Sequence, residues 1–309
     1  MPEAAKVTAP PPAGAQAVHR ALNLLHCFHD NGPDLSASDL ARRMGLSVST
    51  AHRLARTLVS TGFLEQDAHT ARYRLGPTVA ELGRLSFHQR GLHLAGPELD
   101  LLARRTGATA DLAIRSGPHA VILVGGSVRP EDGLGLRRPL HSTALGKVLL
   151  AWPGPGDPGP AALGPLTAFT GRTITDPDAL EAELAKVRES GHALNDGESA
   201  AGVRTLAVPV LDGEGRARFA LAVRSTAARL TADRLPDALA RAKACAAALA
   251  VLLLPPDQRG PDHPPRRSHL SRQPRSPRWS RSPRRSHGSG SAGNLRPKIA
   301  VEVKGGSTR

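Results

Sequence analysis

The sequence predicts an α+β chain with two domains, a helix between them and unstructured ends. Three observations predict this organisation. Apolar residues recur at helical spacing over residues 16–60, short strand-like runs alternate with helices over residues 95–254, and the ends are rich in Pro, Ala, Ser and Arg. The 309 residues are 40% hydrophobic but only 3% aromatic, so two cores can form and both must be aliphatic. We expect residues 1–15 to be disordered.

Residues 16–60 predict three helices. The first has an apolar face formed by Val18, Ala21, Leu22, Leu25 and Phe28. The second follows Ser36, a predicted N-cap with Asp39 in the capping-box position, and it ends at Gly45, because Gly tolerates the left-handed conformation. Ser47 caps the third helix, residues 48–60. The apolar stripe of that helix is Val48, Ala51, Leu54, Ala55 and Leu58. Helix, short turn and helix form a helix-turn-helix, whose second helix enters the DNA major groove.

A predicted hairpin completes the first domain, residues 16–76. Residues 63–66 and 72–75 form its strands, with Arg72 and Arg74 on one side and Tyr73 and Leu75 toward the helices. No acid occurs between Ser47 and Gly62, which suits phosphates and guanine edges. The predicted DNA-binding residues are Ser47, Ser49, Thr50, His52, Arg53, Arg56, Arg72 and Arg74. We expect base contacts from residues 49, 50, 52 and 53 and backbone contacts from the other three arginines. A helical scaffold with solvated charges is the structural alternative.

Residues 77–94 predict a linker helix with an apolar edge at Val79, Leu82, Leu85 and Leu92. The second domain, residues 95–254, begins with a helix at residues 97–106. Predicted strands then cover residues 110–115, 119–125, 192–195, 204–211 and 217–224, and predicted helices cover residues 144–152, 179–190 and 231–254. Two strands, helices, three strands and a closing helix indicate an antiparallel sheet with helices packed on it.

The net charge of +14 is concentrated in the tail. Residues 255–309 hold 13 Lys/Arg and 3 Asp/Glu, whereas residues 16–76 hold 7 Lys/Arg and 5 Asp/Glu. DNA binding by the first domain must therefore rest on the placement of its arginines and not on bulk charge. We expect the Arg/Ser/Pro-rich tail to be disordered, because it cannot bury enough apolar area to offset the entropy of ordering. It either adds nonspecific attraction to DNA or is dispensable.

Several segments resemble IclR-family bacterial transcription regulators. In the first domain these are residues 20–25 (RALNLL), 47–54 (SVSTAHRL) and 72–76 (RYRLG). In the second they are residues 139–147 (PLHSTALGK), 191–198 (GHALNDGE), 202–203 and 207–210. The resemblance covers residues 15–254 in collinear order. It implies a GAF-like sensor fold for the second domain and a homodimer or tetramer. It also implies that the linker helix takes part in dimer contacts; the alternative is that this helix is a simple surface connector.

The resemblance also implies an effector pocket. Position by position, the implicated residues are Ala144, Leu145, Asn195, Thr205, Ala222 and Arg224. The family often has small hydroxyl residues at the last two positions, so Arg224 is a departure. Inside the pocket its guanidinium would pair a ligand carboxylate, whereas at the strand end it would point to water. The start of the helix at Ala144 also favours an anion. Lys147 and Glu198 are expected to have structural roles, in capping or pairing, and not to contact the ligand.

Catalytic and metal-binding patterns are weak in this sequence. Gly146-Lys147 lacks the upstream Gly and the Ser/Thr of a P-loop, no G-x-S-x-G occurs, and the 13 His are scattered. Cys27 and Cys245 are expected to be buried small residues, not a disulfide or a metal site. No run approaches 18 apolar residues, and residues 1–13 lack the pattern of a signal peptide, so we expect a cytoplasmic protein without a membrane span.

The predicted function is therefore a DNA-binding transcription regulator, not an enzyme, with no cofactor. Its expected partners are a double-stranded operator and a small organic effector that bears a carboxylate. Two alternatives remain: a small-molecule-converting enzyme with a fused winged module, and a nonspecific nucleic-acid binder that acts through the tail. Repression is the working expectation, although the sequence does not separate it from activation. The effector, the operator and the choice of dimer or tetramer stay open.

Overall fold

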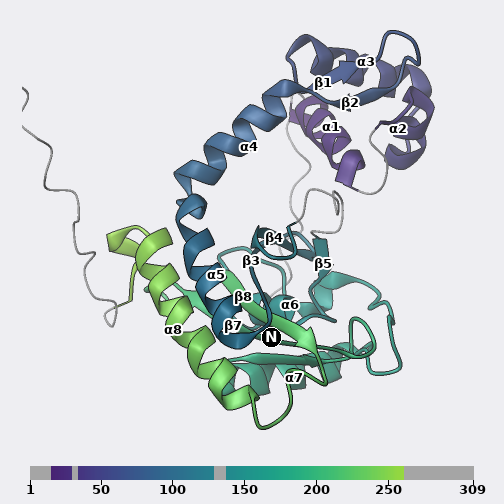
Figure 1. Cartoon of the computed structure of the whole chain (residues 1–309). Coiled ribbons are helices and arrows are strands. Elements are labelled where there is room, and N and C mark those ends of the chain that lie inside the picture. Colours follow the sequence, from purple (N-terminus) through teal and green to yellow (C-terminus); the bar gives the residue numbers. More distant parts are fainter. Residues whose placement is uncertain (1–14, 30–33, 129–136, 261–309) are drawn as a thin grey trace, which may run out of the picture. The chain divides into compact units, whose positions relative to one another are not determined.

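The computed structural model describes residues 15–29, 34–128 and 137–260 (Figure 1). The disorder expected for residues 1–14 and 261–309 lies outside these residues. Ala15 already belongs to a helix, and residues 255–260 are described, so the ordered chain extends slightly further than expected at both ends. None of the helices in the described ranges is long and apolar enough to cross a membrane.

The N-terminal domain has a winged helix-turn-helix fold, as predicted. Its elements are α1 (Ala15–His26), the 3-10 helix η1 (Cys27–His29), α2 (Ala37–Met44), α3 (Val48–Ser60), β1 (Leu64–Gln66) and β2 (Tyr73–Leu75). The two strands pair antiparallel, and Leu35 forms a bridge to Tyr73. The core is aliphatic apart from Phe28 and Tyr73. Its fully buried residues include Leu24, Leu40, Ala51, Ala55 and Tyr73.

The predicted helix boundaries of the helix-turn-helix are confirmed. The Ser36 hydroxyl accepts from the Asp39 N–H at 3.1 Å, and the Asp39 carboxylate accepts from the Ser36 N–H at 3.1 Å. The Ser36 hydroxyl also donates to the Asp39 carboxylate at 2.7 Å, and this bond, together with the one from the Ser36 N–H, lowers the pKa of Asp39. Gly45 ends α2 in the left-handed region at φ 62°, and Ser47 caps α3.

Two side-chain orientations differ from the prediction. On α1 the domain core buries Leu24, while Val18 and Leu22 are exposed, so the apolar face is rotated from the one expected. On β2, Tyr73 is buried but Leu75 is exposed. The chain leaves the hairpin directly after Leu75, which therefore lacks a covering layer.

The predicted linker helix is divided. Helix α4 (Pro77–Gln89) ends before Gly91, which adopts φ 68°, and a 3-10 helix η2 (Leu92–Leu94) leads into α5 (Ala95–Thr106). A left-handed residue cannot continue a right-handed helix, so the break falls at this glycine. Helix α4 buries none of its residues, and Leu82 and Leu85 are exposed.

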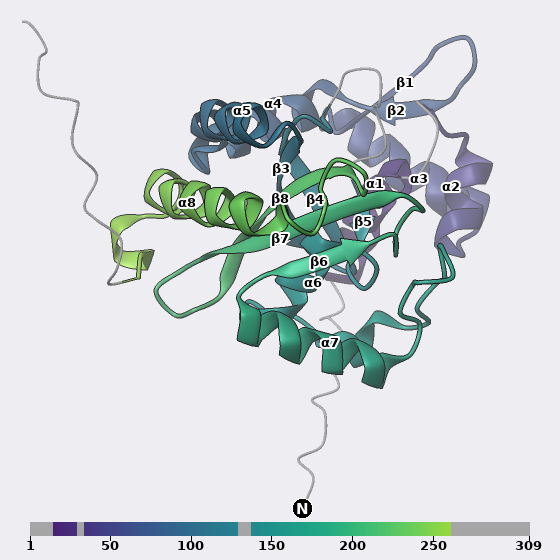
Figure 2. The same ribbon diagram turned by 60° about the horizontal axis from the view of Figure 1, so that its bottom comes forward.

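The C-terminal domain is one antiparallel sheet between two pairs of helices. The strands are β3 (Thr109–Ser116), β4 (His119–Gly125), β5 (Arg137–Pro139), β6 (Ala193–Asp196), β7 (Val203–Leu211) and β8 (Ala217–Thr226). Their order is β5-β4-β3-β8-β7-β6. The helices are α6 (Ala144–Ala151), the 3-10 helix η4 (Pro160–Leu163), α7 (Pro177–Ser190), α8 (Leu235–Leu253) and the 3-10 helix η5 (Pro256–Gln258). Figures 1 and 2 show α5 and α8 on one face and α6 and α7 on the other. The predicted sheet-and-helix sensor fold is confirmed.

Alternation along β8 explains the two faces. Leu221 and Val223 pack into the core under α5 and α8, whereas Ala220 and Ala222 pack under α6. The small alanines let α6 approach closely. Gly146 in α6 allows an even closer contact, because a Cβ there would lie 2.2 Å from the Leu140 carbonyl oxygen. Strand β5 was not predicted, since three residues ending in Pro give no alternation signal.

The two cysteines are free and lie in different domains. Cys245 on α8 is buried against α5, as expected, and burial raises the pKa of its thiol to about 12. Cys27 is half-buried, so its predicted burial is only partial.

Candidate functional site

Helix α3 has an exposed basic face. Ser49, His52, Arg53 and Arg56 are exposed, while Ala51, Ala55 and Leu58 hold the helix in the core. Within the described residues, neither Arg53 nor Arg56 forms an ion pair. Two guanidinium groups therefore project from one helix with no acid to neutralise them, which is the state that a phosphate or a guanine edge requires.

The first turn of α3 carries a cluster of hydroxyl groups. Ser47 Oγ lies 2.8 Å from Thr50 Oγ1 and 3.1 Å from Ser49 Oγ, and it accepts from the Thr50 N–H. The cluster sits at the positive end of the helix dipole. Hydroxyl donors at a helix N-terminus suit a phosphate, whereas the base contacts predicted for Ser49 and Thr50 stay predictions.

The two wing arginines differ from those of α3, because each is paired with an acid of its own domain. Arg72 forms ion pairs with Asp34 and Asp39, and its Nη2 donates to the Asp34 carbonyl at 3.1 Å. Arg74 pairs with Glu65 across the hairpin. The structure thus gives Arg72 a task within the fold, fastening β2 to the start of α2. The sequence did not predict the ion pair between Arg72 and Asp34, because the two residues are 38 positions apart.

A cavity of about 330 Å³ opens in the C-terminal domain beside the N-terminus of α6. Its described lining comes from β5, the segment before α6, the loop between η4 and α7, the loop after β6, the start of β7 and the last part of β8. The lining residues are Arg137, Arg138, Pro139, Ser142, Thr143, Phe169, Ser199, Ala200, Val203 and Arg224. Of the six predicted effector residues, Arg224 is the one among them. Ser142 and Phe169 were not predicted.

Arg224 lies within a row of cross-strand partners. Asn195 pairs with Thr205, Thr205 pairs with Arg224, and Arg224 pairs with Thr109, across β6, β7, β8 and β3. The Arg224 Nη2 donates to Ser127 Oγ at 2.8 Å, and Ser127 Oγ in turn donates to the buried Asp111 at 2.7 Å. The side chain is half-buried and turned along the α6 face of the sheet.

Ser142 supplies the unsatisfied polar group of this cavity. The residue is fully buried (0% exposed), and its Oγ has no hydrogen-bond partner among the described residues. The adjacent Thr143 is already engaged, since its hydroxyl donates to the Pro139 carbonyl at 2.7 Å and accepts from the Gly146 N–H at 3.1 Å. A buried hydroxyl without a partner costs free energy, so Ser142 Oγ marks a position where a ligand oxygen would be favourable.

Asn195 holds the walls of the cavity together. Its Nδ2 donates to the Ser142 carbonyl at 2.7 Å and to Ser199 Oγ at 2.9 Å, and its Oδ1 accepts from the Glu198 N–H at 2.9 Å. Both of its N–H donors and one lone pair of its Oδ1 are thus used by protein, which favours a positioning role over the predicted ligand contact. The other predicted residues, Ala144, Leu145, Thr205 and Ala222, are buried and do not line the cavity.

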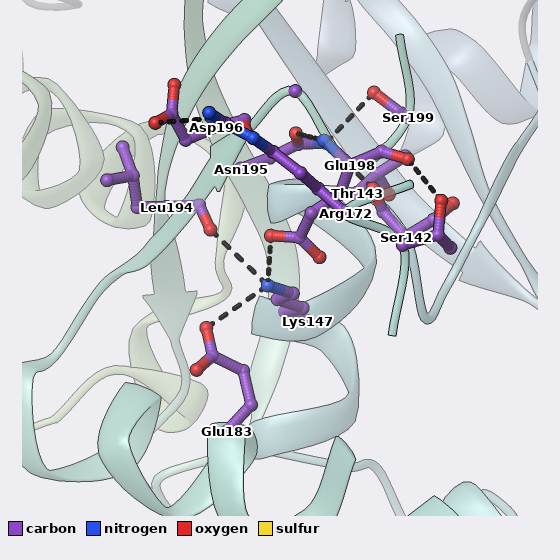
Figure 3. A network of polar contacts seen from close by, with 12 residues as sticks. Ser142, Thr143, Lys147, Arg172, Glu183, Leu194, Asn195, Asp196, Glu198 and Ser199 are labelled. Atoms are coloured by element: carbon purple, nitrogen blue, oxygen red, sulfur yellow. Dashed lines mark hydrogen bonds and ion pairs between the residues drawn. The ribbon is translucent and has the colours of Figure 1, made fainter. Parts of the chain in front are cut away.

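Behind the cavity, Lys147 and Glu198 form an ion pair with each other, which is consistent with the structural roles expected of them. Lys147 Nζ lies 2.6 Å from Glu198 Oε1 and 3.1 Å from Glu183 Oε1, and it donates to the Leu194 carbonyl at 3.4 Å (Figure 3). Burial raises the pKa of Glu198, although Lys147 opposes the shift. The network links α6, α7 and the loop after β6, and it contains no nucleophile or base that reaches the cavity. No group of three potential metal ligands occurs in the described ranges.

A winged helix with a free basic face and a sensor domain with a polar cavity define a ligand-responsive DNA-binding regulator. The family description "IclR helix-turn-helix domain" matches residues 17–68, and "Bacterial transcriptional regulator IclR C-terminal" matches residues 88–251. A curated relative, the HTH-type transcriptional regulator XynR of Escherichia coli K12, is 36% identical over 225 residues, which are 70% of this chain and 88% of the relative. The chain belongs to the IclR family of bacterial transcriptional regulators.

Other relatives agree with this assignment. The DNA-binding transcriptional repressor YiaJ of Escherichia coli K12 is 31% identical over 71% of this chain and 81% of the relative. The crystal structure of a protein assigned as an IclR regulator from Silicibacter sp. TM1040 is 31% identical, with a TM-score of 0.67 over 81% of this chain and 99% of that one. An IclR homologue from Microbacterium hydrocarbonoxydans, solved with 4-hydroxybenzoate, is 26% identical, with a TM-score of 0.60 over 77% and 98%.

Proposed function

We propose that this regulator binds a specific operator through α3 and that a carboxylate-bearing effector in the cavity beside α6 changes its affinity for DNA. The proposed DNA binding rests on one observation: the guanidinium groups of Arg53 and Arg56 are exposed and form no ion pair with an Asp or Glu within the described residues. We assign base contacts to Ser49, Thr50, His52 and Arg53. Ser47, Arg56 and Arg74 are assigned to the phosphate backbone, and Arg72 to anchoring the wing.

The observation that carries the effector half is the cavity itself. It combines an unpartnered buried hydroxyl, Ser142 Oγ, with the guanidinium of Arg224 and the N-terminus of α6. A carboxylate would satisfy all three groups at once. The relative solved with 4-hydroxybenzoate, itself a carboxylate, supports this class of ligand.

Self-association fits the exposed apolar side chains. Val18 and Leu22 on α1 and Leu82 and Leu85 on α4 are exposed in the single chain. We propose that they are covered in a homodimer or tetramer, so that two copies of α3 reach successive major grooves about 34 Å apart or a multiple of that distance. The relative named a repressor supports repression as the sign of regulation.

The test starts with the full chain and a pool of random duplexes, from which bound sequences are selected. We expect a palindromic consensus. Deleting residues 261–309, which carry most of the net positive charge, should leave that consensus intact. A nonspecific binder would instead lose most of its affinity with the tail and would yield no consensus.

The effector half is tested on the selected operator with 4-hydroxybenzoate as the probe. Coupling between two sites is typically ~1–3 kcal/mol, so the probe should change operator affinity by ~5–150-fold. Arg224→Gln should remove this response. If Arg224→Gln responds like the parent chain, the assigned site is wrong.

A further inference from the structure

The phenol of Tyr73 is buried in the N-terminal domain without a hydrogen-bond partner. Tyr73 is 0% exposed, and its hydroxyl has no partner among the described residues. A buried hydroxyl without a partner costs free energy, and buried tyrosines usually place this group where it finds one. A phenylalanine would fill the same space without that cost. The hydroxyl of Tyr73 therefore points to a partner that it gains in another state of the protein.

The fold holds Tyr73 firmly in this place. Its backbone pairs with Gln66 of β1 and also exchanges two hydrogen bonds with Leu35, at 2.8 and 2.9 Å. Its ring belongs to the same aliphatic core as Ala51 and Ala55 of α3. Because both the backbone and the ring are held, the hydroxyl cannot move to a partner, so the partner has to come to it.

Two basic side chains of α3 are neighbours of this phenol. The His52 ring lies edge-on to the Tyr73 ring, with centroids 6.5 Å apart. Arg56 follows one helical turn later on the same side of α3. Its positive charge acts on the phenol, since burial raises the pKa of Tyr73 and Arg56 opposes that shift. Both basic side chains are exposed, and neither has an ion pair within the described residues.

The guanidinium of Arg56 is better suited than the His52 ring to serve two acceptors at once. It carries five N–H donors in a planar fork, whereas a neutral imidazole carries one. It can therefore donate to a phenol oxygen and still donate to a phosphate. The exposed side chain also has many rotamers, and an acceptor that selects one of them would reduce the entropy that is lost when DNA binds.

From this arrangement we propose that Tyr73 is a positioning residue for Arg56 in the operator complex. The inference rests on the proposed contact of Arg56 with the phosphate backbone, and it adds the group that orients this contact. The phenol oxygen accepts a hydrogen bond from the Arg56 guanidinium, whose remaining N–H groups donate to a phosphate. One hydrogen bond thus joins the second wing strand to the recognition helix at the DNA surface.

The experiment is a double-mutant cycle on the selected operator, measured with the full chain by fluorescence anisotropy. Tyr73→Phe removes the hydroxyl and keeps the ring, so its melting temperature should equal or exceed that of the parent chain. Operator affinity should nevertheless fall about tenfold, since a hydrogen bond to a charged group contributes roughly that much. In the Arg56→Ala background, Tyr73→Phe should have no further effect, because the hydroxyl acts through Arg56.

The matched control is Ser60→Ala. It removes an exposed hydroxyl of the same helix, which donates to the Thr57 carbonyl at 2.8 Å, and it should leave operator affinity unchanged.

A second measurement observes the phenol directly. The sequence contains a single tyrosine, so an isotope label at tyrosine Cζ gives one NMR signal. Saturating operator should shift this signal in the parent chain, and the shift should largely disappear in Arg56→Ala. Equal shifts in the two chains would overturn the proposal, since they would show that the phenol environment does not depend on Arg56.

The outcomes separate this inference from the proposed function. If Arg56→Ala leaves operator affinity unchanged, the proposed phosphate contact is wrong and the inference falls with it. If Arg56→Ala weakens binding but Tyr73→Phe does not, the phosphate contact stands and the positioning role is wrong. If Tyr73→Phe weakens binding equally in the parent and in Arg56→Ala, the hydroxyl acts on DNA without Arg56, and the inference is again wrong. A lower melting temperature of Tyr73→Phe would also overturn it, because the hydroxyl would then have a partner in the free protein.

Discussion

Lys147 Nζ lies 2.6 Å from Glu198 Oε1 in an ion pair that is almost completely buried, with the Lys147 side chain 1% exposed. The pair connects the core helix α6 to the loop that carries Ser199 and Ala200 into the effector cavity. Glu183 on α7 adds a second carboxylate at 3.1 Å. The cavity wall is thus attached to the interior of the domain by charge, behind the surface that a ligand would meet.

Removing one partner of this pair should be costly. Lys147→Met leaves two carboxylates near a buried site with no cation, and the expected loss is ~3–5 kcal/mol of unfolding free energy. The double variant Lys147→Met/Glu198→Gln should recover part of the loss, because no uncompensated charge remains. Urea unfolding of both variants measures the difference. Equal destabilisation by the single and the double variant would show that packing, not charge, dominates at this position.

The pH dependence of Lys147→Met follows from Glu198. Burial raises the pKa of Glu198 above its ordinary range, and Lys147 opposes that shift. An acid with a raised folded-state pKa favours folding at low pH, and this contribution is lost as pH rises through the folded-state pKa. Without Lys147 the pKa of Glu198 should rise further. We therefore expect the stability deficit of Lys147→Met to grow as the pH rises from the ordinary range of a Glu carboxyl, about 4.3, through the raised folded-state pKa of Glu198.

The control for this prediction is the same double variant. Glu198→Gln removes the titrating carboxyl, so the deficit of Lys147→Met/Glu198→Gln should depend less on pH than that of Lys147→Met. Unfolding midpoints at four or five pH values are sufficient. A deficit that stays constant with pH in the single variant would contradict the assigned titration.

The sequence was most informative where structure depends on near neighbours. Ser36 with Asp39, Gly45 and Ser47 set helix ends through bonds that span at most a few residues, and these positions were predictable. The segments that carry the family resemblance were sufficient for the overall architecture. Strand β5 was missed, because a short edge strand ending in Pro shows no periodicity.

Contacts between distant segments were not predictable. The pairing of Arg72 with Asp34 depends on how the hairpin folds back on the helices. Asn195 was expected to face a ligand, but its bonds to Ser142 and Ser199 arise only when β6 lies beside the start of α6. One signal could have identified Ser142. It lies directly before Thr143, the N-cap of α6, and the start of this helix was already assigned to the pocket.

Arg53 and Arg72 should respond differently to truncation. Arg53→Ala removes an unpaired guanidinium from α3, so it should weaken operator binding by ~1–3 kcal/mol and relax one base position. Arg72→Ala removes ion pairs to Asp34 and Asp39, so its main effect should be a lowered melting temperature with little loss of operator affinity. Fluorescence anisotropy on single-base operator variants, together with thermal melts, separates the two. A uniform loss of operator affinity in Arg72→Ala, without a loss of stability, would return Arg72 to the DNA backbone contacts.

Asn195→Ala tests whether that residue positions the cavity or contacts the ligand. The change removes the side-chain bonds to Ser142, Glu198 and Ser199. Because buried polar groups are then left unpaired, we expect the free energy of unfolding to fall by ~1–3 kcal/mol. A positioning role predicts the same fractional loss of affinity for every carboxylate probe. Calorimetry with benzoate and 4-hydroxybenzoate checks this. A loss confined to one probe would indicate a direct contact instead.

Gly146 should be intolerant of even one methyl group. Its Cβ would lie 2.2 Å from the Leu140 carbonyl oxygen and 2.3 Å from the Leu140 Cα, and backbone atoms cannot move aside as a flexible side chain can. We expect Gly146→Ala to shift α6 and to cost ~1–3 kcal/mol or more, with a loss of probe binding, because Thr143 and Ser142 move with the helix. Gly83 in α4 is the matched control, since a Cβ there meets nothing within 4 Å. Gly83→Ala should stabilise by up to ~1 kcal/mol through helix propensity. If the two alanines have equal effects on thermal melting and on 4-hydroxybenzoate binding, the close contact of α6 with Leu140 does not shape the cavity.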